Sequence, residues 1–211
     1  MAERKDKEVF YVGDPMCSWC YGFTKINLSL QEQCKDRAKV SLVVGGLHID
    51  WTEPQDDDRK RFLREHWEEI GERSGQPFVF DILDRDDFVY NTEPACRAAV
   101  TARVMHDHTK ALEFFVELQR AFYAENIDVT QPGPLRELAE GFGLDGKAFA
   151  QLFDTDDLKT ETMNDFQFAR ALGVNGFPTM VVREDESYAY LTVGYQPFEN
   201  LQPALEGWLE S

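Results

Sequence analysis

Residues 8–23 read Glu-Val-Phe-Tyr-Val-Gly-Asp-Pro-Met-Cys-Ser-Trp-Cys-Tyr-Gly-Phe. The apolar, β-rich run from Val9 to Val12 predicts a short buried strand. Gly13-Asp14-Pro15 interrupts this run, and Asp14-Pro15 is a turn signal. The residues from Cys17 to about Lys35 have the apolar spacing of a helix. A pair of cysteines two residues apart, placed where a strand leads into a helix, is typical of a redox-active dithiol.

The chain that follows predicts a second strand and then a helical block. The run from Val40 to Leu47 reads as a strand, which completes one βαβ unit with a parallel pair. From residue 53 to 160 there is little strand pattern, and apolar residues recur at helical spacing. The expected helices in this block are Arg59–Ile70, Pro94–Met105, Leu112–Phe122, Pro134–Ala139 and Asp145–Phe153.

The last part of the chain returns to strands. A helix is expected at Glu161–Leu172, an antiparallel hairpin at Met180–Val182 and Tyr188–Gly194, and a closing helix at Pro197–Leu209. This order predicts an α/β fold, a βαβ–αββα sandwich with an all-helical insertion. We therefore predict a discontinuous domain from residues 1–52 and 161–211, and an inserted helical domain from residues 53–160.

Composition limits the classes of partner. The 211 residues include 22 basic and 39 acidic side chains, for a net charge of −17. This balance argues against a nucleic-acid or anionic-membrane partner, because phosphate binding needs clustered Lys and Arg. No apolar run approaches the roughly 18–20 residues of a membrane helix, and the charged start lacks a signal-peptide pattern. We expect a cytoplasmic protein, in which four cysteines are too few for a disulfide framework.

The chemistry of the pair follows from its position. Thiol–disulfide exchange needs a thiolate nucleophile and a second thiol that resolves the mixed disulfide. At a helix start, Cys17 would face unpaired N–H groups and the positive end of the helix dipole, which favour its thiolate. Cys20 lies one helical turn further along the chain. We expect it to be more buried than Cys17 and to resolve the mixed disulfide. Between them, Ser18 can donate a hydrogen bond and Trp19 offers apolar surface to a substrate.

A second motif lies at Phe177-Pro178-Thr179, directly before the first strand of the hairpin. The βαβ–αββα arrangement would bring this motif beside Cys17. Pro178 has no N–H, and a cis bond before it would turn the Phe177 carbonyl toward the cysteines. We predict that Phe177, Pro178 and Thr179 bind substrate together with the two residues between the cysteines.

The chain resembles the DsbA family of thioredoxin-like oxidoreductases along essentially its whole length. The resemblance rests on Cys17-Ser-Trp-Cys20, the helical insertion and Gly176-Phe-Pro-Thr179. Within the family, the chain is similar to a cytosolic branch with an Asp-Pro-x-Cys-x-Trp-Cys signature. The resemblance implies Cys17 as nucleophile, Cys20 as resolving thiol and Phe177-Pro178 as a cis-proline loop that binds substrate backbone. It also implies no metal or tightly bound cofactor, with glutathione or a partner reductase as the recycling thiol.

Other sites fit the sequence less well. Zinc would need two more ligands, but Cys34 and Cys96 are single and are expected to be buried, and the four histidines form no recognisable pair. The glycines of residues 141–147 match nucleotide-loop patterns, yet they follow a helix instead of the strand that both mechanisms require. The acidic segments that start at Asp84 and Asp154 lack the Gly and Glu positions of a calcium loop. We expect segments 56–58, 84–87 and 154–157 to be solvated loops.

Three functions remain. The first is a dithiol–disulfide oxidoreductase, of reductase or isomerase type, acting on protein or small-molecule disulfides. Its direction stays open, because Ser18-Trp19 replaces the Pro-His of periplasmic members of the resembled family. The second is a glutathione-dependent enzyme similar to kappa-class transferases or 2-hydroxychromene-2-carboxylate isomerases, which usually have Ser at the Cys17 position. The third is a thioredoxin-like binding module or holdase without redox turnover.

Overall fold

The computed structural model describes residues 6–211, so the first five residues of the predicted discontinuous domain lie outside the described part. The elements are β1 (Lys7–Gly13), α1 (Ser18–Gly22), α2 (Thr24–Cys34), β2 (Lys39–Val44), α3 (Asp57–Ser74), α4 (Asp81–Asp84), α5 (Glu93–Met105), α6 (His108–Glu125), α7 (Pro132–Gly141), α8 (Gly146–Phe153), α9 (Asp156–Ala171), β3 (Thr179–Glu184), β4 (Ser187–Val193) and α10 (Phe198–Glu210).

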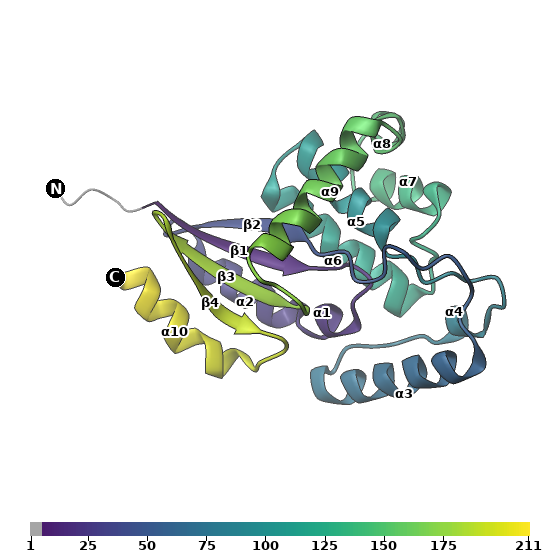
Figure 1. Ribbon diagram of the computed structural model, residues 1–211, viewed down its shortest axis with the longest axis horizontal. Coiled ribbons are helices and arrows are strands. Elements are labelled where there is room, and N and C mark those ends of the chain that lie inside the picture. Colours follow the sequence, from purple (N-terminus) through teal and green to yellow (C-terminus); the bar gives the residue numbers. More distant parts are fainter. Residues whose placement is uncertain (1–5) are drawn as a thin grey trace.

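The sheet has the strand order β2-β1-β3-β4 (Figure 1). β1 pairs with β2 in parallel, with Val9 opposite Val40. It pairs with β3 in the antiparallel sense, with Tyr11 opposite Met180, and β3 and β4 are also antiparallel. The predicted βαβ unit, the antiparallel hairpin and the thioredoxin-like sandwich are therefore confirmed.

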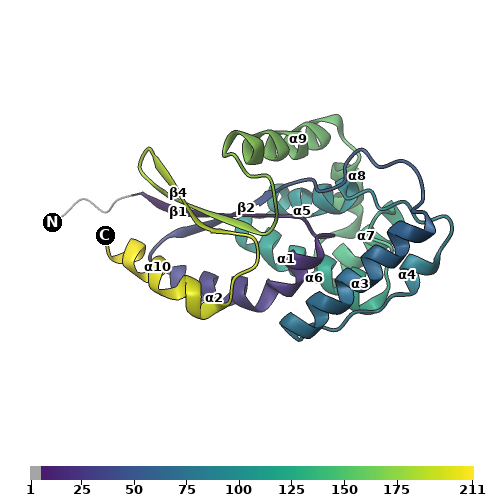
Figure 2. The same ribbon diagram turned by 60° about the horizontal axis from the view of Figure 1, so that its bottom comes forward.

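Successive side chains of β1 point to opposite faces of the sheet, as in any β-strand. Val9 and Tyr11 belong to the larger core, which α2 and α10 complete. Phe10 and Val12 belong to a second cluster with Ala169 of α9. Figure 2 shows the result, with α9 on one side of the sheet and α2 and α10 on the other.

The helices α3 to α8 gather at one end of the sheet (Figure 1). Trp67 is fully buried at their centre, with its ring centroid 4.8 Å from that of Tyr123. The rings of Tyr11 and Phe115 lie 5.6 Å apart and join the sheet to this block in one core. The expected boundary between residues 160 and 161 falls inside α9, so this helix links the block to the sheet. The division into two domains stays a prediction.

The helix expected from Cys17 to about Lys35 is instead two helices that meet at Phe23. A side chain at Gly22 would place its Cβ 2.9 Å from Ile70, so α1 packs closely against α3. The ring of Phe23 is fully buried and lies 6.3 Å from that of Tyr11. The chain therefore bends where one helix turns toward the block and the next toward the sheet.

The second strand ends at Val44, three residues earlier than expected. The Gly45 N–H still donates to the Gly13 carbonyl at 2.8 Å, but Gly46 has a φ of +70° and turns the chain away. A left-handed φ of this kind suits glycine, which has no Cβ.

All three acidic segments are exposed, as expected, but two of them form helix starts instead of loops. Asp56 and Thr155 are the N-caps of α3 and α9, where they accept from the N–H groups of Arg59 at 2.8 Å and Leu158 at 3.3 Å. The aspartates after each cap lie in the first helical turn. Carboxylates at a helix start are favoured by the free N–H groups and by the helix dipole. The helix ending in the third segment, α4, was not expected from the sequence.

Candidate active site

The two cysteines lie where β1 leads into α1. Cys17 is the residue before the helix; its N–H donates to the Asp14 carbonyl, and its carbonyl accepts from the Tyr21 N–H, both at 3.0 Å. Cys17 is 5% exposed and Cys20 is 0% exposed, and both are free thiols. The expectation that Cys20 is the more deeply buried of the two is confirmed.

The loop before β3 lies against Cys17. The peptide bond between Phe177 and Pro178 is cis, and the Phe177 carbonyl accepts from the Cys17 thiol at 3.8 Å. The predicted neighbourhood of Cys17 and the Phe177-Pro178 loop is thus present. Thr179 is fully buried, and its hydroxyl donates to the Gly176 carbonyl at 2.8 Å, so this side chain supports the loop.

A cavity of about 240 Å³ opens at Cys17. Four of the predicted site residues line it, namely Cys17, Ser18, Trp19 and Phe177. The other lining residues are Met16, Leu47, His48, Trp51, Arg59, Phe62, Leu63, His66 and Tyr90, which the sequence did not single out. Met16 directly precedes Cys17, and the others come from the loop after β2, from α3 and from the segment before α5. No local motif marks them, because only the fold brings these segments to the cysteines.

Trp19 forms one side of the cavity mouth. Its ring centroid lies 5.6 Å from that of His66 and 5.5 Å from that of Tyr195. The guanidinium carbon of Arg73 lies 4.9 Å from the same ring centroid, within cation–π range. These contacts hold the indole in place as part of the cavity wall.

The surroundings of Cys20 are closed and apolar. A Cβ at Gly13 would lie 3.2 Å from both the Cys20 sulfur and the Tyr11 ring carbon Cζ. Burial raises the pKa of Cys20 well above its usual value, and the neighbouring Cys17 raises it further. The Tyr11 hydroxyl is buried without a hydrogen-bond partner among the described residues. Burial and the nearby Cys20 raise the pKa of Tyr11 as well.

Asp14 anchors the turn before the cysteines and has a larger role than the turn signal that the sequence suggested. Its side chain accepts from the Met16 N–H at 2.8 Å, from the Leu47 N–H at 2.7 Å and from the Cys96 thiol at 3.3 Å. Asp14 is fully buried, and this burial raises the pKa of its carboxyl. Cys96 is also buried, as expected, but its partner is a carboxylate.

Two tyrosines fix the residue before Cys17. The hydroxyls of Tyr90 and Tyr123 donate to the Met16 carbonyl at 2.7 and 2.5 Å. They also lie 3.1 Å from each other. Both rings belong to the helical block, so the block fixes the backbone that presents the thiol.

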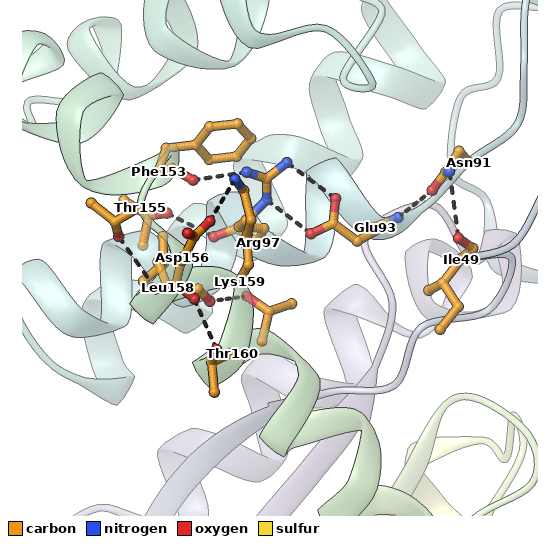
Figure 3. A network of polar contacts seen from close by, with 12 residues as sticks. Ile49, Asn91, Glu93, Arg97, Phe153, Thr155, Asp156, Leu158, Lys159 and Thr160 are labelled. Atoms are coloured by element: carbon orange, nitrogen blue, oxygen red, sulfur yellow. Dashed lines mark hydrogen bonds and ion pairs between the residues drawn. The ribbon is translucent and has the colours of Figure 1, made fainter.

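A polar network links the segment before α5 to the loop after β2 and to α8 (Figure 3). The Asn91 amide donates to the carbonyls of Trp51 at 3.2 Å and Ile49 at 3.5 Å, and its oxygen accepts from the Glu93 N–H at 2.9 Å. The Glu93 carboxylate pairs with Arg97 at 2.8 Å, and Arg97 donates to the last carbonyl of α8 at 2.8 Å. The loop that carries Trp51 is therefore tied to α5 and α8.

Among residues 6–211, no three His, Cys, Asp or Glu side chains group as a metal site would require. In the same range, no helix is long and apolar enough to cross a membrane.

Comparisons with known proteins agree with this geometry. The chain is 33% identical to a candidate protein disulfide isomerase from Nitrosomonas europaea, with a TM-score of 0.90 over 97% of this chain and 98% of that one. It is 26% identical to the cytosolic disulfide reductase DsbM from Pseudomonas aeruginosa, in a structure with GSH, with a TM-score of 0.74 over 96% and 97% of the two chains. It is 23% identical to the ClpXP adapter protein SpxH from Halalkalibacterium halodurans, over 98% of this chain and 69% of the relative.

The family model of the DSBA-like thioredoxin domain matches residues 8–206. This match spans the sheet, both cysteines, the helical block and the Phe177-Pro178 loop. The protein therefore belongs to the DSBA-like thioredoxin domain family.

Proposed function

We propose that the protein is a cytoplasmic dithiol–disulfide oxidoreductase of reductase or isomerase type, in which Cys17 attacks and Cys20 resolves. The observation that carries this proposal is the unequal placement of the two thiols. Cys17 lines a cavity beside the Phe177 carbonyl, whereas Cys20 is fully buried. A substrate disulfide can reach the first thiol, and the second is kept for the intramolecular step.

The chemistry runs in two exchanges. The Cys17 thiolate attacks one sulfur of the substrate disulfide, forms a mixed disulfide with it and releases the other sulfur as a thiolate, which takes up a proton. Cys20 then gives up its proton and attacks the Cys17 sulfur, which forms the Cys17–Cys20 disulfide and releases the second substrate thiol. In sum, the substrate disulfide gains two electrons and two protons, and the dithiol loses them.

Two thiols of glutathione would return the pair to the dithiol and leave as glutathione disulfide. The similarity to a disulfide reductase solved with GSH supports this recycling. A reducing compartment keeps a free-thiol resting state, which favours reduction or isomerisation of substrates over net oxidation.

The test is the reduction of insulin disulfides by purified variants. Cys17→Ser should abolish turnover, and Cys20→Ser should accumulate a mixed disulfide that intact-mass measurement detects. Cys34→Ala is the matched control, because Cys34 is equally buried but lies at the end of α2, away from the cavity. Turnover retained in Cys17→Ser would overturn the proposal.

A binding module is the second candidate, and the similarity to adapter proteins favours it. Such a role would not require electron transfer. A double Cys17→Ser, Cys20→Ser variant that still captures the partner of the wild-type protein, while wild type reduces no disulfide, would support this function over the first.

A further inference from the structure

The cavity at Cys17 differs in charge from the rest of the molecule. The chain carries 39 acidic residues and a net charge of −17, yet no Asp or Glu among residues 6–211 lines this cavity. Its walls are mainly aromatic and aliphatic, and they include the rings of Trp51 and Phe62. One guanidinium, that of Arg59, is part of the lining.

Arg59 lies in the first turn of α3, held against aromatic rings. Its guanidinium carbon is 5.0 Å from the ring centroid of Trp51 and 5.9 Å from that of Phe62. Within the described part of the chain, no carboxylate pairs with this guanidinium. Arg61 and Arg64, on the same helix, pair with Asp58 and Asp84. The guanidinium N–H groups of Arg59 are therefore available to a ligand in the cavity.

The two histidines of the lining do not share this charge. Burial and the neighbouring Arg59 lower the pKa of His48 to about 4. Burial also lowers the pKa of His66. Both imidazoles are therefore neutral near pH 7, and Arg59 is the permanent charge among the lining residues.

We propose that this cavity selects disulfides and thiols that carry a carboxylate near the sulfur, and that Arg59 binds this carboxylate. The inference rests on the proposed dithiol function of Cys17. A guanidinium and a carboxylate form two parallel hydrogen bonds, and an aromatic shelf fixes the plane of the guanidinium. The cavity of about 240 Å³ is smaller than the roughly 300–1,000 Å³ of drug-sized pockets. It therefore holds a short thiol acid or the acid-bearing end of a peptide disulfide.

The reaction of the reduced protein with small symmetric disulfides tests this selection. Rapid mixing with dithiodipropionate, hydroxyethyl disulfide or cystamine compares an acid, a neutral and a cationic substrate that are similar in size. We expect Arg59→Gln to lower the ratio of the acid rate constant to the neutral rate constant by about tenfold, and Arg59→Lys to restore part of it.

Arg61→Gln is the matched control, because it makes the same change in net charge two residues further along α3. This variant should leave the acid-to-neutral ratio as in wild type. An equal fall of the ratio in Arg61→Gln would assign the effect to long-range charge and overturn the role of Arg59. Equal slowing of all three disulfides by Arg59→Gln would overturn it too.

Oxidised glutathione, added as a fourth substrate, distinguishes the two sources of the carboxylate. If Arg59→Gln lowers the rate constant with dithiodipropionate, the ligand of Arg59 is the carboxylate of a short thiol acid. If Arg59→Gln lowers the rate constant with oxidised glutathione alone, the ligand is the carboxylate of a peptide. Wild-type protein that reacts with none of the four disulfides would contradict the proposed function itself, whatever the behaviour of Arg59.

Discussion

The ring of Phe177 occupies the space that a side chain at Gly45 would need. A Cβ at Gly45 would lie 2.0 Å from the ring carbon Cε1 of Phe177, so no residue other than glycine fits without moving the ring. Gly45 directly follows β2, and Phe177 precedes β3. This contact therefore fixes the loop whose carbonyl faces the Cys17 thiol.

Gly45→Ala tests the contact. Overpacking should lower the free energy of unfolding by about 1–3 kcal/mol. Because Phe177 must shift, insulin reduction should also slow by about tenfold to a hundredfold. Gly207→Ala is the control, since Gly207 lies in α10 with no atom within 4 Å of a built Cβ. It should raise stability by roughly 0.5–1 kcal/mol. Wild-type turnover in Gly45→Ala would contradict the role of the contact.

Asp14→Asn tests the anchor of the cysteine loop. The new amide would turn a donor toward one of the N–H groups that Asp14 accepts from, those of Met16 and Leu47. Urea unfolding should show that the free energy of unfolding falls by about 2–3 kcal/mol. Asp107→Asn, at the exposed N-cap of α6, should change stability little, because both residues cap well. A loss of equal size in both variants would count against the anchor.

Tyr11→Phe tests the hydroxyl beside Cys20. An unpartnered buried hydroxyl is costly, so its removal should raise the free energy of unfolding by about 1 kcal/mol. The same hydroxyl can donate to the Cys20 thiolate when it forms, so the mixed disulfide should resolve more slowly, by about tenfold.

Tyr90→Phe provides the opposite case in the same core. Its hydroxyl donates to the Met16 carbonyl, so this variant should lower the free energy of unfolding by about 1 kcal/mol. A destabilised Tyr11→Phe with unchanged resolution kinetics would show that the Tyr11 hydroxyl has no such role.

The pH dependence of stability follows from His108. Burial and the nearby Arg103 lower its pKa from 6.5 to about 4 in the folded protein, where its Nδ1 accepts from the Leu42 N–H at 3.1 Å. The unfolded chain binds a proton more readily, so this contribution is complete above about pH 6.5 and is lost as the pH falls toward about 4. Because partial exposure screens the effect, we expect about 1 kcal/mol from this residue.

His108→Gln should flatten that part of the pH profile. Urea unfolding at about pH 7 and about pH 4.5 measures the difference between wild type and variant. His106→Gln, at an exposed position, should retain the wild-type slope. An unchanged slope in His108→Gln would contradict the assignment.

The sequence predicted those parts of the fold that depend on local patterns. The runs at Val9–Val12 and Met180–Val182 are apolar and short, and both are strands in the sheet. The bend at Phe23 was not predictable, because it depends on the close approach of Gly22 to a helix about 50 residues away. Asp56 and Thr155 are good capping residues, but each lies in a polar segment whose sequence fits a loop as well as a helix start.

The candidate site divides in the same way. Cys17, Cys20 and the Phe177-Pro178 loop could be singled out because each belongs to a motif with a chemical reason. Arg59 and Trp51 could not, since their place at the cavity depends on how α3 and the loop after β2 pack. Asp14 was visible only as a turn residue, because its partners Leu47 and Cys96 are distant in the chain.

The most direct test of the central claim is the redox equilibrium of the Cys17–Cys20 pair in glutathione buffers, followed by thiol labelling and intact mass. We predict a single reversible two-electron transition, with a midpoint between about −270 and about −180 mV. Cys17→Ser should remove this transition, and Cys34→Ala should keep it. The absence of a Cys17–Cys20 disulfide at every ratio of reduced to oxidised glutathione would contradict the account.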